Sequence, residues 1–213
     1  MMNIEFKNMF DETIYEHQAA RLDSYYKIYS LNGKIKQKER FQNGQLQLMT
    51  YYKEANEVHH EIMDEFFSSG MYISIVGRES IIGGYVLEKG FDYDENGALY
   101  VKRNELFDVN GNIIAFDYTK DLITNIPEFE KTRKYFYNPA VNPDYHLFSC
   151  SYDENTNGKL LEIFYNNYHL NDDGRDAIYF ADIPEDQETL KQLTGISSQV
   201  AAYYVSPTVV PVF

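Results

Sequence analysis

The segment from Asp92 to Gly97 carries the residue types that a calcium site needs. Asp92, Asp94 and Asn96 place side-chain oxygens at alternate positions, and Gly97 then allows a sharp turn. A calcium loop also obtains two oxygens from a Glu at its twelfth position, where this chain has Arg103. Asp and Asn are equally common in hairpin turns, since their side chains bond to nearby backbone N–H groups. A hairpin turn is therefore the favoured interpretation, and a calcium site is the alternative.

A second segment, from Asp153 to Gly158, repeats this pattern of oxygen-bearing side chains followed by glycine. Its twelfth position is Phe164, so the bidentate carboxylate is missing here as well. The same two interpretations apply.

Two other groups of residues contain side chains that could bind a metal ion or act as a nucleophile and its base, but neither group is a complete site. His60 and Asp64 stand four residues apart, so a helix would bring both within reach of one metal ion, although no third ligand follows at a diagnostic spacing. A strand would place His146, Phe148 and Cys150 on one face, and a thiol nucleophile needs a base beside it. A polar helix surface and an inert buried cysteine are the favoured interpretations, because neither spacing is demanding.

Asn-Gly and Asp-Gly steps predict the elements that would position these residues. A two-residue hairpin loop needs positive φ, which glycine adopts freely and Asn or Asp tolerates. Short segments rich in Tyr, Phe and Leu lie between the steps. The pattern predicts repeated β-hairpins, with steps at Asn32-Gly33, Asn43-Gly44, Asn96-Gly97, Asn110-Gly111, Asn157-Gly158 and Asp173-Gly174.

The steps recur about every sixty residues, which predicts three internal repeats with the order strand, turn, strand, turn, strand. We expect these repeats at 23–84, 85–144 and 145–204, within a single domain spanning 1–213. Alternating residues support the strands: one face would carry Ile35, Gln37, Glu39 and Phe41, and one face of the next strand would carry Leu46, Leu48, Thr50 and Tyr52.

A few short helices are also predicted. Asn56 is a candidate cap for a helix with Val58, Ile62 and Phe66 on one side. Further helices are expected after Ile126-Pro127-Glu128 and Ile183-Pro184-Glu185, since Pro is tolerated in a first helical turn and Glu is favoured there.

Two more segments carry a recognisable apolar pattern. Phe6 to Gln18 is a candidate helix, because Phe6, Phe10 and Ile14 stand four residues apart. Residues 71–76 and 81–87 predict a strand pair around a turn that contains Gly77. The fold class is therefore mainly β, an antiparallel meander of Asn-Gly hairpins with a minority of helix.

Composition limits the partners that the chain can have. The 213 residues include 33 acidic and 19 basic ones, a formal net charge of −14, which repels nucleic acid and anionic membrane surfaces. The electrostatic expectation is a basic protein partner. The lone Cys150, no apolar run of membrane-spanning length and no visible secretory signal predict the cytoplasm. The apolar tail 205–213 is expected to pack against the body or a second subunit.

The hairpin steps also carry a family resemblance. Tyr29 to Ile35, followed by Phe41 to Leu46, resembles the Tyr-x-x-Asn-Gly-Lys-Leu repeat of bacterial MORN-like hairpin proteins, some of which are described as antitoxins. Tyr152 to Leu160 is a looser copy. The resemblance implies a hairpin-repeat fold and a binding role, and it carries over no active residue.

The sequence thus favours a non-catalytic, acidic interaction module, an antitoxin or immunity-type binder of a basic partner, with no cofactor. One alternative is a small-molecule or glycan-binding β-module assisted by calcium at Asp92, Asp94 and Asn96. Another is an enzyme whose site is assembled from residues distant in the sequence.

Overall fold

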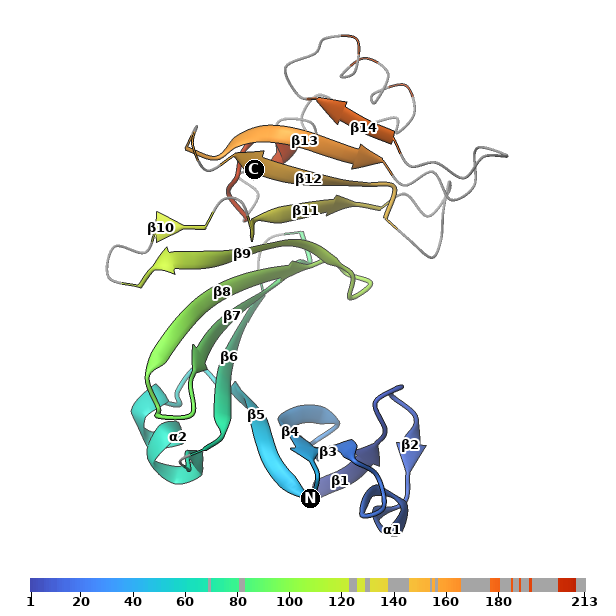
Figure 1. Ribbon diagram of the computed structural model, residues 1–213, viewed down its shortest axis with the longest axis vertical. Helices are drawn as coiled ribbons and strands as arrows, with labels where there is room; N and C mark the ends of the chain where they lie inside the picture. The colour runs from blue at the N-terminus through green and yellow to red at the C-terminus, as the bar shows by residue number, and fades with distance from the viewer. Residues whose placement is uncertain are drawn as a thin grey trace. The chain divides into compact units, whose positions relative to one another are not determined.

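The computed structural model is mainly β and divides into two compact units (Figure 1). The first unit comprises residues 1–79 and 88–102, and the second comprises 80–87 and 103–213. The structure describes residues 1–68, 70–80, 83–122, 126–128, 131–137, 146–153, 155, 157–165, 177–180, 185, 188, 192 and 203–209. Within these residues no helix is long and apolar enough to cross a membrane.

The first unit is built on a twisted sheet with two helices. Its strand order is β2-β1-β3-β4-β5-β6-β7-β8. The elements are β1 (Met2–Lys7), β2 (Thr13–Ile14), α1 (Glu16–Ala19), β3 (Ser24–Leu31), β4 (Lys34–Gln42), β5 (Gln45–Lys53), α2 (His59–Phe66), β6 (Tyr72–Ser80), β7 (Val86–Tyr93) and β8 (Leu99–Phe107), the last three of which also contribute residues to the second unit.

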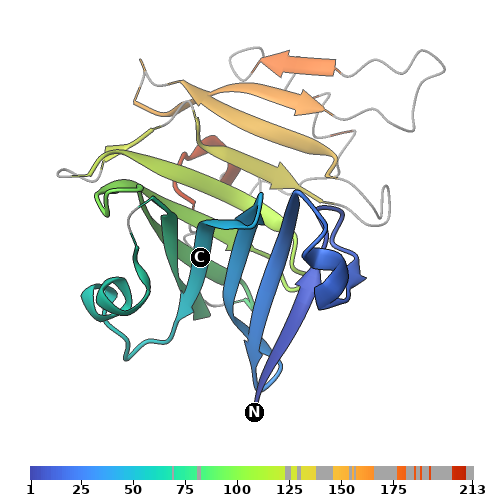
Figure 2. The same ribbon diagram turned by 60° about the horizontal axis from the view of Figure 1, so that its bottom comes forward.

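The strand pair β5 and β6 departs from the predicted antiparallel meander. These strands run parallel, with Met49 opposite Ile73 and Tyr51 opposite Ile75. Parallel neighbours need a crossover connection, and α2 supplies it between the end of β5 and the start of β6 (Figure 2). The predicted helix is confirmed, although it begins after Val58 and has no side-chain cap at Asn56.

The core of the first unit lies between α2 and one face of the sheet. Ile62 of α2 packs among buried residues of β5 and β6, and Ile73 and Ile75 are fully buried. A β-bulge leaves Gln47 without a partner on β4, since Arg40 pairs with Leu48 and Phe41 with Leu46. The core therefore takes Leu46 together with Met49 and Tyr51, and the predicted shared face of Leu46, Leu48, Thr50 and Tyr52 is wrong.

The second unit continues the meander. Its strand order is β8-β9-β11-β12-β13-β14, and β10 pairs with β9. The additional strands are β9 (Ile113–Asp121), β10 (Ile126–Pro127), β11 (Arg133–Phe136), β12 (Phe148–Asp153), β13 (Lys159–Tyr165) and β14 (Ala177–Phe180). Among the described residues, these strands pair antiparallel with their neighbours.

The core of the second unit lies under the C-terminal segment, defined here as residues 203–209. Tyr204 packs on a cluster that contains Phe148, Cys150 and Ile163, and Val209 packs on Leu106 and its neighbours. Tyr204 and Val209 are buried. The expected packing of the apolar tail 205–213 against the body is confirmed for Val209.

The hairpin steps form two kinds of turn. At Asn32-Gly33 and Asn43-Gly44 both residues have positive φ, as a two-residue hairpin loop of type I′ requires. At Asn96-Gly97 and Asn110-Gly111 only the glycine has positive φ. The prediction of a turn at each of these steps is confirmed.

Three helix and turn predictions are wrong. The stretch from Phe6 to Gln18 forms the strands β1 and β2, which pair with one another, and only Glu16–Ala19 is helical. The segment after Pro127 enters β11 at Arg133, where pairing with β9 and β12 outweighs a helix-compatible sequence. Gly77 lies inside β6, opposite Lys53, and is no turn residue.

Other predicted features fall partly or wholly outside the described residues. Asp173-Gly174, Phe129, Ile183-Pro184 and most of the helix expected after them belong to this group, as does 210–213. Glu185, Glu188 and Gln192 are described and are helical.

Two glycines at positive φ offer a matched test of packing at a turn. A Cβ added at Gly44 would meet nothing within 4 Å, whereas one at Gly97 would lie 3.2 Å from the Phe67 ring. Both substitutions to alanine strain the backbone by about 1 kcal/mol. We expect Gly97→Ala to cost about 1 kcal/mol more than Gly44→Ala in urea unfolding, because the Phe67 ring must also move. Equal losses would show that the ring moves freely.

Candidate functional site

The calcium candidate forms a hydrogen-bonded turn between β7 and β8. The Asp94 Oδ1 atom accepts the backbone N–H groups of Asn96 and Ala98, both at 2.9 Å. These two hydrogen bonds hold the pKa of Asp94 below its usual value. The same pattern recurs at Asp108, whose Oδ1 atom accepts from Asn110 and Asn112.

The engaged oxygen favours the turn interpretation over calcium. A ligand oxygen that already accepts two N–H groups has less capacity left for a cation. Within the described part of the chain, no group of three His, Cys, Asp or Glu residues is placed to hold a metal ion. His60 and Asp64 are both exposed on α2, and among the described residues no third His, Cys, Asp or Glu joins them to hold a metal ion.

Cys150 and His146 do not form a nucleophile and base. Cys150 lies inside the core cluster with Phe148 and is fully buried. The His146 ring instead packs edge-on against Tyr135 and Tyr137. Burial raises the pKa of the Cys150 thiol to about 12, so the thiol stays protonated at neutral pH. The interpretation of an inert buried cysteine fits this environment.

A reactive side-chain type that sequence reasoning missed is Lys134, in the middle of β11. It stands directly opposite Cys150 on β12 and opposite Ala115 on β9, and its side chain is fully buried. The only sequence signal is a lysine at an inward-facing position of a strand, and that signal is visible only once the strand and its register are known.

The Lys134 amine holds the C-terminal segment in place. Its Nζ atom donates to the carbonyl oxygens of Tyr203, at 2.5 Å, and Ser206, at 2.7 Å. The same atom lies 3.5 Å from the centre of the Tyr203 ring. Burial lowers the pKa of Lys134 to about 7, and a neutral amine has two N–H donors for these two carbonyls.

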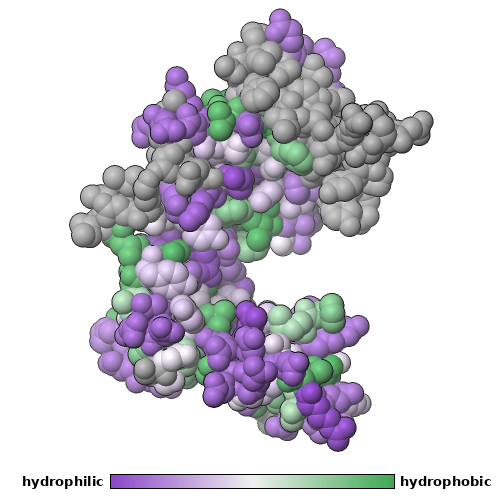
Figure 3. Space-filling view, in the orientation of Figure 1, coloured by the Kyte–Doolittle hydropathy of each residue, from purple (hydrophilic) through white to green (hydrophobic). Residues whose placement is uncertain are grey.

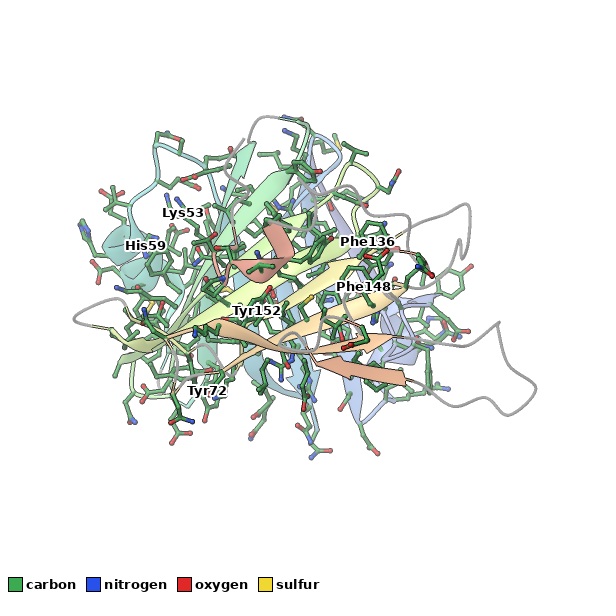
Figure 4. The ribbon with its side chains drawn as sticks, turned by 90° about the horizontal axis from the view of Figure 1, so that it is seen from above. Lys53, His59, Tyr72, Phe136, Phe148 and Tyr152 are labelled. Carbon is green, nitrogen blue, oxygen red and sulfur yellow. The ribbon has the colours of Figure 1, made fainter. Side chains whose placement is uncertain are left out.

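Tyrosine hydroxyls complete this anchor. The Tyr152 hydroxyl donates to the Tyr204 carbonyl at 2.8 Å, and the Tyr204 hydroxyl donates to the Tyr135 carbonyl at 3.1 Å. Phe136 and Phe148, which are labelled in Figure 4, stack with ring centres 5.0 Å apart, and both rings make edge contacts with the Tyr204 ring. Lys134, Tyr152 and Tyr204 are therefore engaged in holding the C-terminal segment in place.

The surface of the first unit over α2 is acidic. Glu61, Asp64 and Glu65 are exposed along the helix, and no Lys or Arg occurs between Glu54 and Gly77. In Figure 3 the atoms over this helix are largely hydrophilic. We define the acidic surface as Glu61, Asp64, Glu65 and Glu95.

Glu95 belongs to this surface because the turn between β7 and β8 packs beside the end of α2. The Gly70 N–H donates to the Glu95 carbonyl at 3.1 Å, and the Phe67 ring contacts Gly97. The acidic surface therefore rests on two elements whose backbones are tied together.

The entry into α2 is fixed by Glu57. Its carboxylate accepts from the Lys36 amine at 2.6 Å, the Tyr51 hydroxyl at 2.8 Å and the Glu54 N–H at 2.5 Å. Burial alone would raise the pKa of Glu57, but these three hydrogen bonds outweigh it and hold the pKa below its usual value. At the first residue of the helix, the His59 ring packs edge-on against Phe91, and burial lowers the pKa of His59.

We expect Lys134→Met to destabilise the second unit by about 2–4 kcal/mol, since the variant leaves the Tyr203 and Ser206 carbonyls buried without a donor. Urea unfolding measures this loss, and faster proteolysis of the C-terminal segment should accompany it. The control is Lys131→Met, whose side chain is 58% exposed and pairs with Glu128. A loss below about 0.5 kcal/mol in both variants would contradict an anchoring role for Lys134.

The pH dependence of stability should report the same amine. Between the folded pKa of about 7 and the ordinary value of 10.5, the unfolded chain carries a proton that the folded chain has released. The free energy of unfolding should therefore rise with pH relative to Lys134→Met, by at most about 1.4 kcal/mol per pH unit. Urea unfolding between about pH 7 and 8 stays below the ordinary Cys pKa of 9.0 and the ordinary Tyr pKa of 10.0, at which the unfolded chain titrates. A constant difference between the proteins would mean that Lys134 stays protonated.

No protein-family model, curated protein or solved structure gives a significant match to this chain. The resemblance to MORN-like hairpin proteins therefore stays a prediction, and function has to be argued from the residues themselves.

Proposed function

We propose that this protein is a non-catalytic interaction module that binds a basic protein partner, in the manner of an antitoxin or immunity protein. The observation that carries the proposal is the acidic surface of Glu61, Asp64, Glu65 and Glu95, which stands on the anchored helix α2 and on the turn between β7 and β8 beside it. A concentration of one charge sign steers an oppositely charged partner and favours it over others.

The environments of the reactive groups support the same proposal. Cys150 is a buried thiol of raised pKa, and both donors of a neutral Lys134 amine are accounted for by carbonyls. Nucleophilic catalysis needs an accessible, activated group with a base beside it. A binding role makes no such demand.

Anchoring of α2 supports recognition of a partner by a rigid surface. The Glu57 carboxylate fixes the start of the helix, and Ile62 packs its inner side into the core. Exposed carboxylates held on a fixed backbone lose less conformational entropy on binding than carboxylates on a loose segment.

The test is a pull-down with the tagged protein at low and raised salt, with partners identified by mass spectrometry. The variant Glu61→Gln, Asp64→Asn, Glu65→Gln should lose a stoichiometric basic partner that wild type retains. The control Glu12→Gln, Glu16→Gln, Asp23→Asn removes the same charge from other exposed positions and should retain it. Raised salt should release the partner from wild type, since salt screens the attraction.

Two results would overturn the proposal. One is the absence of any stoichiometric partner at low salt. The other is equal loss of the partner from both triple variants, because net charge rather than the acidic surface would then govern binding.

A further inference from the structure

The sheet of the first unit has a second face, which points away from α2. Two basic side chains on this face, Lys38 and Arg40, have no ion-pair partner among the described residues. In the first unit, carboxylates pair with the basic side chains of Lys7, Lys36, Arg78 and Lys89. Lys38 and Arg40, on β4, make no ion pair within the described part of the chain. Arg21, Lys27, Lys34 and Lys53 make none there either. Lys38 and Arg40 differ from them in standing two residues apart on one face of the sheet.

Of these two side chains, Arg40 is the one with a buried N–H donor that lacks a hydrogen-bond acceptor. Its Nε atom is buried and has no hydrogen-bond partner. Arg40 as a whole is half-buried, so an incoming carboxylate would bind the guanidinium through its more exposed N–H groups, and the unpaired Nε shows that no group of the described chain neutralises this cation at close range.

Aromatic and apolar side chains surround these cations. Arg40 stands opposite Tyr26 on β3 and opposite Leu48 on β5, and Leu48 stands opposite Tyr72 on β6. The Lys38 Nζ atom lies 4.1 Å from the centre of the Tyr26 ring. We define the β4 cation strip as Tyr26, Lys38, Arg40, Leu48 and Tyr72.

The register places the β4 cation strip on the face of the sheet away from α2. Gln37 and Glu39 of β4 stand opposite Tyr51 and Met49, which contact the helix side of the core. Lys38 and Arg40 alternate with them and so point to the other face. The strip is therefore distinct from the acidic surface.

We propose that the β4 cation strip binds an acidic peptide segment with carboxylates at alternate positions. Lys38 and Arg40 are two residues apart on one strand, about 6.6–7 Å along the sheet. An extended peptide lying along β4 repeats its side chains at the same distance, so one carboxylate meets the Arg40 guanidinium and the next meets the Lys38 amine. Tyr26 and Leu48 flank the bound segment.

Charge favours a peptide over a nucleic acid. The net charge of −14 repels a long polyanion, and that repulsion grows with each phosphate. A short segment with two carboxylates meets the local cations at a smaller electrostatic penalty. Exposed Tyr72, beyond Leu48, adds an aromatic contact that a peptide side chain can use.

The experiment is fluorescence anisotropy with a rhodamine-labelled synthetic peptide that carries glutamate at two alternate positions. Wild type should bind this peptide and bind its glutamine counterpart about tenfold more weakly or worse. Lys38→Gln with Arg40→Gln should weaken binding of the glutamate peptide by at least about tenfold. Circular dichroism and thermal unfolding verify that each variant is folded.

The matched control is Lys27→Gln with Lys34→Gln. It lowers the net charge by the same amount at β3 and at the first residue of β4, outside the strip. Its binding should stay within about twofold of wild type. Equal weakening in both double variants would overturn the proposal, because the general field and not the strip would then be responsible.

Two further results would also overturn it. One is no binding of the glutamate peptide at about 1 mM. The other is tighter binding of a short single-stranded oligonucleotide or of inorganic phosphate than of the peptide, which would identify a phosphate site. These outcomes are independent of the acidic surface on α2, so the two proposals stand or fall separately.

Discussion

Both units depend on covering one apolar face of a sheet. An apolar sheet face that no other segment covers would leave large apolar residues in water. The segments that cover these faces are short: α2 in the first unit and residues 203–209 in the second. Each cover is tied down by a lysine amine on a strand. Lys36 donates to the Glu57 carboxylate at the entry to α2, and Lys134 donates to two carbonyls of the C-terminal segment. The short covers stay in place because polar anchors supplement their limited apolar contact.

The two anchors differ in their electrostatics. The Lys36–Glu57 pair is partly exposed, and three hydrogen bonds hold the pKa of Glu57 low. Lys134 is fully buried, so desolvation disfavours its charged form and lowers its pKa to about 7. A neutral amine still donates two hydrogen bonds, which makes a buried lysine compatible with an apolar core. A lysine opposite a cysteine is a pair of groups that can serve nucleophilic chemistry. Here the Lys134 amine donates to two carbonyls and the Cys150 thiol lies in the core.

Both proposals use surfaces of the first unit. It presents carboxylates on α2 and, on the other face of the sheet, Lys38 and Arg40, which make no ion pair among the described residues, and these two surfaces differ in sign. Such an arrangement suits selective contact with proteins better than contact with one uniform polyelectrolyte. The turn at Asp94 shows how a motif with ligand-type residues can be a structural device, because its carboxylate is engaged by the backbone that it helps to bend.

The sequence by itself determined the local features: the β-rich class, the positive φ at Asn32 and Asn43, and the helix around Ile62. These follow from interactions between residues close in the chain. Tertiary structure decided the rest. A bulge at Gln47 sends the side chains that follow it in β5 to the face opposite the predicted one. Residues 133–136, predicted to be helical, form the strand β11 because they pair with β9 and β12. The roles of Lys134 and Arg40 depend on which strands lie beside them and on what covers each face. Strand register joins residues far apart in the sequence, and a shift of one residue sends a side chain to the opposite face.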